Sequence, residues 1–258
     1  MTRQLLEPVP RVLPLGDAAL TVEFGDSIDP ALHARVLGLA AALEQARKVE
    51  GVTEFSGIVD VVPTFRSLTV YFNPLTGDGE RLGKALLVLA ESAGSASAQG
   101  RCWRIPVCFD DDFAPDMNDL AAAKGLSREA VIELMTAATF QVYMIGFMPG
   151  FPYMGGLPTV LEMPRLSSPR KAVPARSLAI AGAMCSVYPW ESPGGWRLLG
   201  RTPVPMFSAS ETDSPSLLAS GDRVCWLAVD RATFLEMEAM ALAGGLDRNS
   251  LLVAQGAS

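Results

Sequence analysis

The chain has 258 residues, 49% of them hydrophobic, which is enough for two small domains with separate cores. Its formal net charge of −7 at pH 7 argues against nucleic-acid binding, which depends on Lys and Arg clustered across a whole face, although a local basic pocket is compatible with it. The N-terminus MTRQLLEPVP lacks the apolar stretch of a secretory signal, and no later window has membrane-spanning length, so we expect a cytoplasmic protein without membrane contact.

The first part of the chain alternates strand and helix patterns. Residues 19–24 alternate between apolar and other side chains, which predicts a half-buried strand. Asp29 and Pro30 predict the start of a helix, because Asp accepts hydrogen bonds from free amides at the cap and Pro suits the first turn. We expect further strands at 52–62 and 68–72 and a helix at about 80–89. These elements predict a small α/β domain over residues 1–92.

A change in composition follows this domain. Residues 91–100 (ESAGSASAQG) are small, polar and aperiodic, as in a flexible linker. Beyond them we expect a strand at 104–109, one short helix from Asp116 to Gly125, and another capped by Ser127. The remainder consists mostly of short apolar runs between Gly-Pro turns, as in a small barrel or sandwich; the runs are 178–181, 185–188 and 224–229. We also expect a last helix capped by Asp230. The second predicted domain therefore covers residues 101–258, with two short helices near its start, and the fold class is α+β.

Two segments of the second half are rich in Gly and Pro, GFMPGFPYMGGLP at 146–158 and SPGGWRLLGRT at 192–202. Such sequences predict loops of fixed shape, and the side chains beside them are cationic and aromatic. Guanidinium and ammonium groups suit a carboxylate, a phosphate or a planar amide. We predict that the substrate- or partner-binding residues are Tyr153, Arg165, Arg170, Lys171, Gly194, Gly195, Trp196, Arg197 and Arg201. The alternatives are solvated or structurally paired cations and a Trp196 that fills the core.

Other candidate sites are weaker. The four cysteines Cys102, Cys108, Cys185 and Cys225 lack C-x-x-C spacing, so we expect buried or half-buried thiols and no bound metal. Three consecutive acids at 110–112 predict a solvated turn, since neighbouring side chains of an extended chain point in alternate directions. The segment 77–85 (GDGERLGKA) is misspaced for a nucleotide loop. The only histidine, His33, is expected on a solvated helix surface, so no catalytic residue is identified.

The spaced blocks GF-PGF-Y-GGLP, PR, PRK-VPA, IAG, YP and SPGGW-LLGRTP occur in one order between about residues 105 and 207, and weaker agreement is found at 15–25 and 71–74. This pattern resembles the family that contains the B subunit of the bacterial ATP-dependent 5-oxoprolinase, the kinase inhibitor KipI and allophanate hydrolase subunit 1. The same module forms part of the carboxyltransferase region of urea carboxylase, as its subdomains C and D. The resemblance implies that the second domain is a cyclophilin-like β-barrel.

The resemblance also implies a function. The main interpretation is the B subunit of a complex that hydrolyses 5-oxo-L-proline to L-glutamate with ATP, together with a partner homologous to the C subunit of that complex and with a separate A subunit. Cations such as Arg165, Arg170, Lys171 and Arg201 would then stabilise developing negative charge, and ATP would bind at a site shared with or supplied by the partners. We expect the isolated chain to be inactive. If Arg165 and Arg170 bind an anionic group, Arg170→Ala should lower the activity of the complex by orders of magnitude with little effect on the melting temperature. The alternatives are a KipI-like inhibitor of a sensor histidine kinase and a carboxyltransferase subunit of the allophanate hydrolase or urea carboxylase type.

The sequence departs from the family at several positions. Met135 stands where a histidine is expected, Arg176 where the V-P-A block usually has glycine, and the pair Met184 and Cys185 where Gln-Thr is common. Position 197, here Arg197, is often histidine or another polar residue. These departures predict an altered polar pocket, and they leave the substrate open.

Overall fold

The computed structural model describes residues 9–49, 53–93 and 100–253. The chain forms two compact units, Met1–Gln99 and Gly100–Ser258, and each is described by itself. Most of the predicted linker, residues 94–99, lies outside the described residues. Within the described part of the chain, no helix has the length and apolar character needed to cross a membrane.

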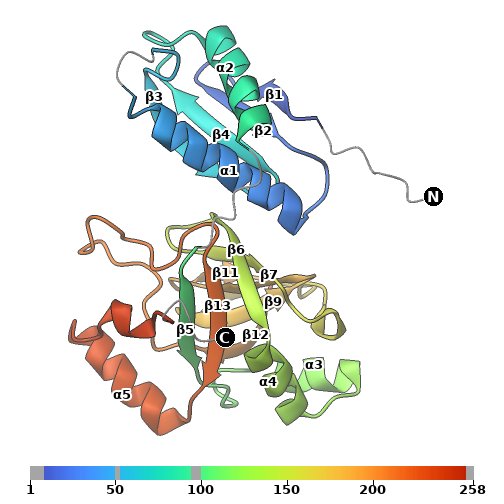
Figure 1. Cartoon of the computed structure of the whole chain (residues 1–258). Helices are drawn as coiled ribbons and strands as arrows, with labels where there is room; N and C mark the ends of the chain where they lie inside the picture. The colour runs from blue at the N-terminus through green and yellow to red at the C-terminus, as the bar shows by residue number, and fades with distance from the viewer. Residues whose placement is uncertain (1–8, 50–52, 94–99, 254–258) are drawn as a thin grey trace. The chain divides into compact units, whose positions relative to one another are not determined.

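The first unit is an antiparallel sheet with two helices on one face, as Figure 1 shows. The strand order is β1-β2-β4-β3, with bounds β1 Arg11–Pro14, β2 Ala19–Glu23, β3 Ile58–Pro63 and β4 Ser67–Phe72. The helices are α1 (Pro30–Ala46) and α2 (Gly79–Ser92). The predicted cap is confirmed, because the Asp29 carboxylate accepts a hydrogen bond from the Ala31 amide at 2.6 Å. Alternating residues of the strands, among them Val22 and Val70, pack against the helices in the core of this unit, together with Phe24 directly after β2.

The structure corrects two expectations in this unit. His33 is fully buried, so its predicted place on a solvated surface is wrong. The buried band of α1 includes His33 and Leu37 beside Leu32 and Val36, and is therefore wider than a single apolar stripe. The predicted strand at 52–62 begins only at Ile58, because residues 54–57 form a turn.

The second unit contains a seven-stranded mixed sheet that curls into a half-barrel (Figure 1). The strand order is β12-β9-β10-β7-β6-β13-β5, and only β13 and β5 pair in parallel. The bounds are β5 Cys102–Val107, β6 Thr139–Ile145, β7 Pro152–Gly155, β9 Ser177–Ala181, β10 Met184–Val187, β12 Arg197–Arg201 and β13 Arg223–Ala228. A separate two-stranded ribbon consists of β8 (Arg170–Val173) and β11 (Ser192–Gly194).

Three α-helices accompany this sheet, α3 (Met117–Lys124), α4 (Arg128–Ala137) and α5 (Arg231–Leu242), with short 3-10 turns at Thr159–Leu161 and Arg248–Leu251. The predicted helix ends are confirmed where they can be compared. Gly125 ends α3 in a left-handed conformation, and the side chains of Ser127 and Asp230 cap α4 and α5.

The two edge strands of the half-barrel meet at one point. The backbones of Cys108, directly after β5, and Arg201, at the end of β12, exchange both hydrogen bonds at 2.9 Å. Gly200 lies at this contact, where an added Cβ would be 2.7 Å from Val107 and 2.9 Å from the Cys108 carbonyl. Glycine therefore permits the close approach of the two edges of the half-barrel at this bridge.

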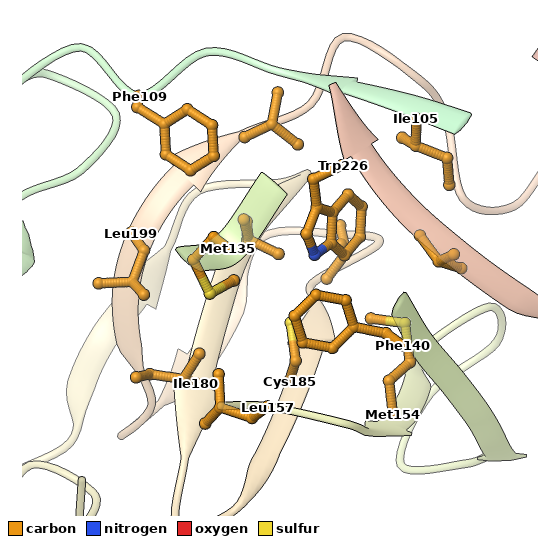
Figure 2. Close-up of a cluster of buried hydrophobic side chains, with 14 of the residues drawn as sticks. Ile105, Phe109, Met135, Phe140, Met154, Leu157, Ile180, Cys185, Leu199 and Trp226 are labelled. Atoms are coloured by element: carbon orange, nitrogen blue, oxygen red, sulfur yellow. The ribbon is translucent and has the colours of Figure 1, made fainter. Parts of the chain in front are cut away.

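The interior of the half-barrel is an apolar core, shown in Figure 2. Side chains from β5, β6, β7, β9, β10, β12 and β13 and from α4 meet there. Phe140 and Trp226 are in tilted ring contact, with centroids 5.9 Å apart. Met135 and Cys185, two of the departures from the family pattern, belong to this same core and are fully buried.

The sheet also contains strands that the sequence analysis did not predict. The segment 146–158, expected to be loop, includes β7, whose first residue is Pro152, a position at which a strand tolerates proline. β6 lacks strict alternation because Val142 and Tyr143 are both buried, so a period-two pattern is not visible.

Candidate functional site

Trp196 belongs to a cluster of aromatic rings outside the main core, with Phe151 at its centre. Trp196 is 5% exposed, and its ring contacts Phe151 at 5.8 Å and Tyr153 at 6.0 Å between centroids. Phe151 also contacts Tyr188, at 5.2 Å. We call Phe151, Tyr153, Tyr188 and Trp196 the aromatic cluster. Trp196 thus fills a small core of its own, while half-buried Tyr153 brings the cluster to the surface.

The glycines beside Trp196 differ in their surroundings. An added Cβ on Gly194 would overlap the Tyr188 hydroxyl, so glycine at this position allows Tyr188 to pack within its own chain. The same atom on Gly195 would lie no closer than 3.7 Å to its neighbours, which is ordinary contact. The space that a side chain would take at Gly194 is therefore occupied by Tyr188 and is not open to a ligand.

Arg170 begins β8 and is held against the aromatic cluster by a buried acid. Its Nη2 donates to the Asp116 carboxylate at 2.6 Å, and its Nη1 donates to the Trp196 carbonyl at 3.4 Å. The second Asp116 oxygen accepts from the Leu198 amide at 2.6 Å, and the Asp116 side chain is 5% exposed. Loss of Arg170 would leave a buried carboxylate without its cation, so the structure argues against the expectation that Arg170→Ala hardly changes the melting temperature.

Arg165 is the most exposed of the predicted cations beside the aromatic cluster. Its guanidinium lies 5.7 Å from the centroid of the Trp196 ring, and the residue is exposed. No carboxylate of the described residues lies within 4.0 Å of it. The charge of Arg165 is therefore available to an anionic group.

The remaining predicted cations are dispersed. Lys171 is exposed and follows Arg170 in β8, so the two side chains point to opposite faces of the ribbon. Arg197 donates from Nε to the Pro164 carbonyl at 3.1 Å. Arg201 donates from Nε to the Ala175 carbonyl at 2.9 Å. The structure brings Tyr153, Arg165, Arg170 and Trp196 together, with Arg197 one residue beyond, whereas Lys171 points away from Arg170.

Arg201 belongs to a second polar group beside α5. Burial lowers the pKa of its guanidinium below the usual value, and the nearby charge of Arg176 acts in the same direction. Arg176 pairs with Glu238 of α5 and donates to the Pro203 carbonyl at 3.0 Å. Arg176 has a φ of +65°, at which an L side chain is strained, and this explains why glycine is usual at this position in the family. In this chain the ion pair with Glu238 offsets the strain.

Tyr188 was not among the predicted site residues, although it contacts them. Burial raises the pKa of its phenol, while a hydrogen bond to the Trp196 backbone and the charges of Arg165 and Arg170 oppose that rise. The Tyr188 hydroxyl is therefore neutral at physiological pH. Asp116 was missed as well, because the sequence analysis used it only as the approximate start of a helix; its side chain makes no capping bond to α3. In the sequence, Tyr188 is marked only by its place in the YP block.

Apolar packing surrounds the positions that depart from the family pattern. Met135 and Cys185 both lie inside the half-barrel (Figure 2), and Met184 packs at the edge of the aromatic cluster. Burial also raises the pKa of the Cys185 thiol, which is the effect of an apolar environment. The interior of the barrel is thus unsuited to a polar ligand, and the candidate site lies on its outer surface.

The described residues contain no cluster of His, Cys, Asp or Glu with the arrangement of a metal site. Asp111 and Asp112 pair with Arg128 at 2.8 Å and Arg231 at 2.7 Å, as expected for a solvated turn. The four cysteines are free thiols, buried or half-buried. Two hollows of this unit, about 250 and 400 Å³ in volume, are lined by residues other than the predicted ones.

Comparison with known proteins identifies the family of this chain and several similar proteins. The family model of the carboxyltransferase domain, subdomain C and D, matches residues 10–218. The B subunit of 5-oxoprolinase from Bacillus subtilis is 35% identical over 231 residues, which cover 85% of this chain and 93% of that protein. The crystal structure of TTHA0988 is 34% identical with a TM-score of 0.70, over 82% of this chain but only 40% of the other. The urea amidolyase of K. lactis shares the fold, with a TM-score of 0.74 at 20% identity over 95% of this chain and 16% of its own.

Proposed function

Because the chain belongs to the carboxyltransferase subdomain C and D family, we propose that it is the B subunit of an ATP-dependent 5-oxoprolinase complex, with 5-oxo-L-proline, ATP and water as reactants and L-glutamate, ADP and phosphate as products. The observation that carries this proposal is the 35% identity to a 5-oxoprolinase B subunit over 93% of that relative. A homologue of the C subunit, together with a separate A subunit, would complete the complex.

We further propose that residues 1–92 and 101–258 are separate domains and that the second is a cyclophilin-like β-barrel. The curled sheet and the bridge between Cys108 and Arg201 support the barrel, and the two compact units support the division. The protein would act in the cytoplasm.

The chemistry requires an activated amide, since a lactam carbonyl reacts slowly with water. ATP would supply this activation by phosphorylating the lactam oxygen, with release of ADP. Water could then add to the carbonyl carbon and the ring C–N bond could break, with the nitrogen taking up a proton. A second water would hydrolyse the resulting acyl phosphate, so that phosphate leaves and the carboxylate of glutamate is formed. The chain's own contribution would be to bind and orient anionic groups. Arg170 is suited to this role by its fixed position between Asp116 and the Trp196 carbonyl.

The site is incomplete in this chain alone. The cations lie on an outer surface, and the segment 77–85 does not have the spacing of a nucleotide loop. We therefore propose that ATP binds at a site shared with or supplied by the partner subunits, and that the isolated chain does not hydrolyse 5-oxoproline.

The experiment is reconstitution. The chain is purified alone and with its co-expressed homologues of the C and A subunits, and the release of ADP is measured with and without 5-oxoproline. We expect ADP release that depends on 5-oxoproline only in the complete mixture. Turnover by the single chain would contradict the shared site. Absence of turnover from an assembled complex would contradict the 5-oxoprolinase assignment and turn attention to the kinase-inhibitor and carboxyltransferase alternatives.

A further inference from the structure

Two exposed aromatic side chains of the second unit lie near the candidate site and have no function in the proposed reaction. Phe147, in the loop between β6 and β7, is 65% exposed, and Trp190, between β10 and β11, is 49% exposed. Single exposed apolar side chains are common on protein surfaces, whereas exposed ones that lie close together mark interaction sites. Neither residue lines the hollows described above.

The backbone at Phe147 is strained. Its φ is +67°, and the Met148 amide donates to the Gly146 carbonyl at 2.8 Å, so a three-residue turn is closed around Phe147. This combination corresponds to the rare γ-turn with positive φ, which a bulky side chain adopts only at a cost. Glycine would relieve that strain. A phenylalanine held outward at such a position suggests that its side chain serves binding rather than folding.

Phe147 and Trp190 are connected through neighbouring rings. Phe147 contacts the buried ring of Phe151 edge-on, with centroids 5.3 Å apart. Trp190 contacts Phe207 at 6.0 Å, and an added Cβ on Gly150 would lie 2.8 Å from Phe207, so the loop of Phe147 packs directly on Phe207. The two exposed rings therefore stand on a firmly packed base, continuous with the aromatic cluster.

The charge beside these rings indicates what binds them. Arg165 is exposed over Trp196, which itself contacts Phe151, and no carboxylate of the part of the chain described lies within 4.0 Å of its guanidinium. Aromatic and arginine side chains together are typical of the residues that contribute most to protein interfaces.

We propose that Phe147, Trp190 and Arg165 form a docking surface for another protein of the complex, whose facing surface offers apolar pockets for the two rings and a carboxylate for the guanidinium. This inference rests on the proposed function for the identity of the partner, the homologue of the C subunit. Protruding rings insert into pockets of a partner, whereas a small ligand needs a hollow on this chain.

The test uses the full chain and its co-expressed homologue of the C subunit. Phe147→Gly and Trp190→Ser are compared with Leu242→Ser and Leu235→Ser on α5, which remove apolar side chains of 80% and 49% exposure elsewhere on the same unit. Dissociation constants for the C-subunit homologue are measured by titration and melting temperatures by thermal unfolding. ADP release with 5-oxoproline is measured in the complete mixture, with the C- and A-subunit homologues at saturating concentration. We expect each docking variant to weaken association by at least about tenfold. The α5 variants should bind like the unsubstituted chain, and Phe147→Gly should melt no lower than that chain.

The outcomes separate the surface from the function. Equal affinity of all variants in an active complex overturns the docking surface and leaves the 5-oxoprolinase assignment intact. A free chain that dimerises through Phe147, seen as a change of mass on substitution, shows that a second copy is the occupant and also overturns it. Failure of the unsubstituted chain to bind or activate the C-subunit homologue overturns the proposed function, and with it this inference.

Discussion

Substitution of Arg170 by alanine should destabilise the second unit by an amount that a surface arginine cannot explain. Asp116 is 5% exposed and its carboxylate accepts from Arg170 and from the Leu198 amide, each at 2.6 Å. Removing one partner of such a buried pair leaves an uncompensated charge, which costs about 3–5 kcal/mol. Because Arg170 is itself 27% exposed and water can enter, we expect about 3 kcal/mol. For a domain of this size that lowers the melting temperature by roughly 6–12 °C.

The assay is thermal and urea unfolding of the full chain, with Arg197→Ala as the matched control. Arg197 is also half-buried beside Trp196, but it donates only to the Pro164 carbonyl, so its loss should cost less than about 1 kcal/mol. The double variant Asp116→Asn with Arg170→Ala removes the buried charge and should be more stable than Arg170→Ala alone. Equal melting temperatures for Arg170→Ala and Arg197→Ala would refute the reasoning, since the pair with Asp116 would then have no structural role.

Other consequences concern glycine, strain and domain limits. Gly194→Ala should lower stability by about 1–3 kcal/mol because its Cβ overlaps the Tyr188 hydroxyl, whereas Gly195→Ala should be close to neutral; similar unfolding curves for the two would contradict this. The variant Arg176→Gly should be more stable than Arg176→Ala by about 1 kcal/mol, the reverse of the usual order, because the backbone φ at this position is +65°. Urea unfolding of both variants measures the difference, and a more stable alanine variant would count against the strain. Finally, residues 100–258 expressed alone should fold and then unfold cooperatively on heating. A circular dichroism spectrum typical of an unfolded chain would argue against a separate domain.

Local signals predicted most of the elements correctly. The caps at Asp29, Ser127 and Asp230 depend on side chains bonding to amides two or three residues away, so their effect can be read from adjacent residues. Gly125 ends α3 for an equally local reason, its left-handed backbone. Strand β6 was missed because burial of neighbouring side chains on both faces removes the alternation on which the prediction relies.

The candidate site was predicted in part. The grouping of Arg165, Arg170 and Trp196 followed from Gly-Pro loops and from the family resemblance, and the structure places these residues together. The roles within the group did not follow, because the partner of Arg170 is Asp116, 54 positions away. Likewise, Gly194 makes room for Tyr188, a contact between separate segments rather than between neighbours in the chain.

By itself, the sequence determined the capped helices and the turns, since each depends on residue types at short, fixed spacing. It also determined the family, which is marked by spaced blocks in one order along the chain. Only the tertiary structure decided which charges are paired and which are free: Arg170 is neutralised by a buried carboxylate, Arg176 by a helix near the C-terminus, and Arg165 remains exposed. The physical reason is that solvation and pairing depend on distance in space, and the curled sheet sets these distances between segments far apart in the chain.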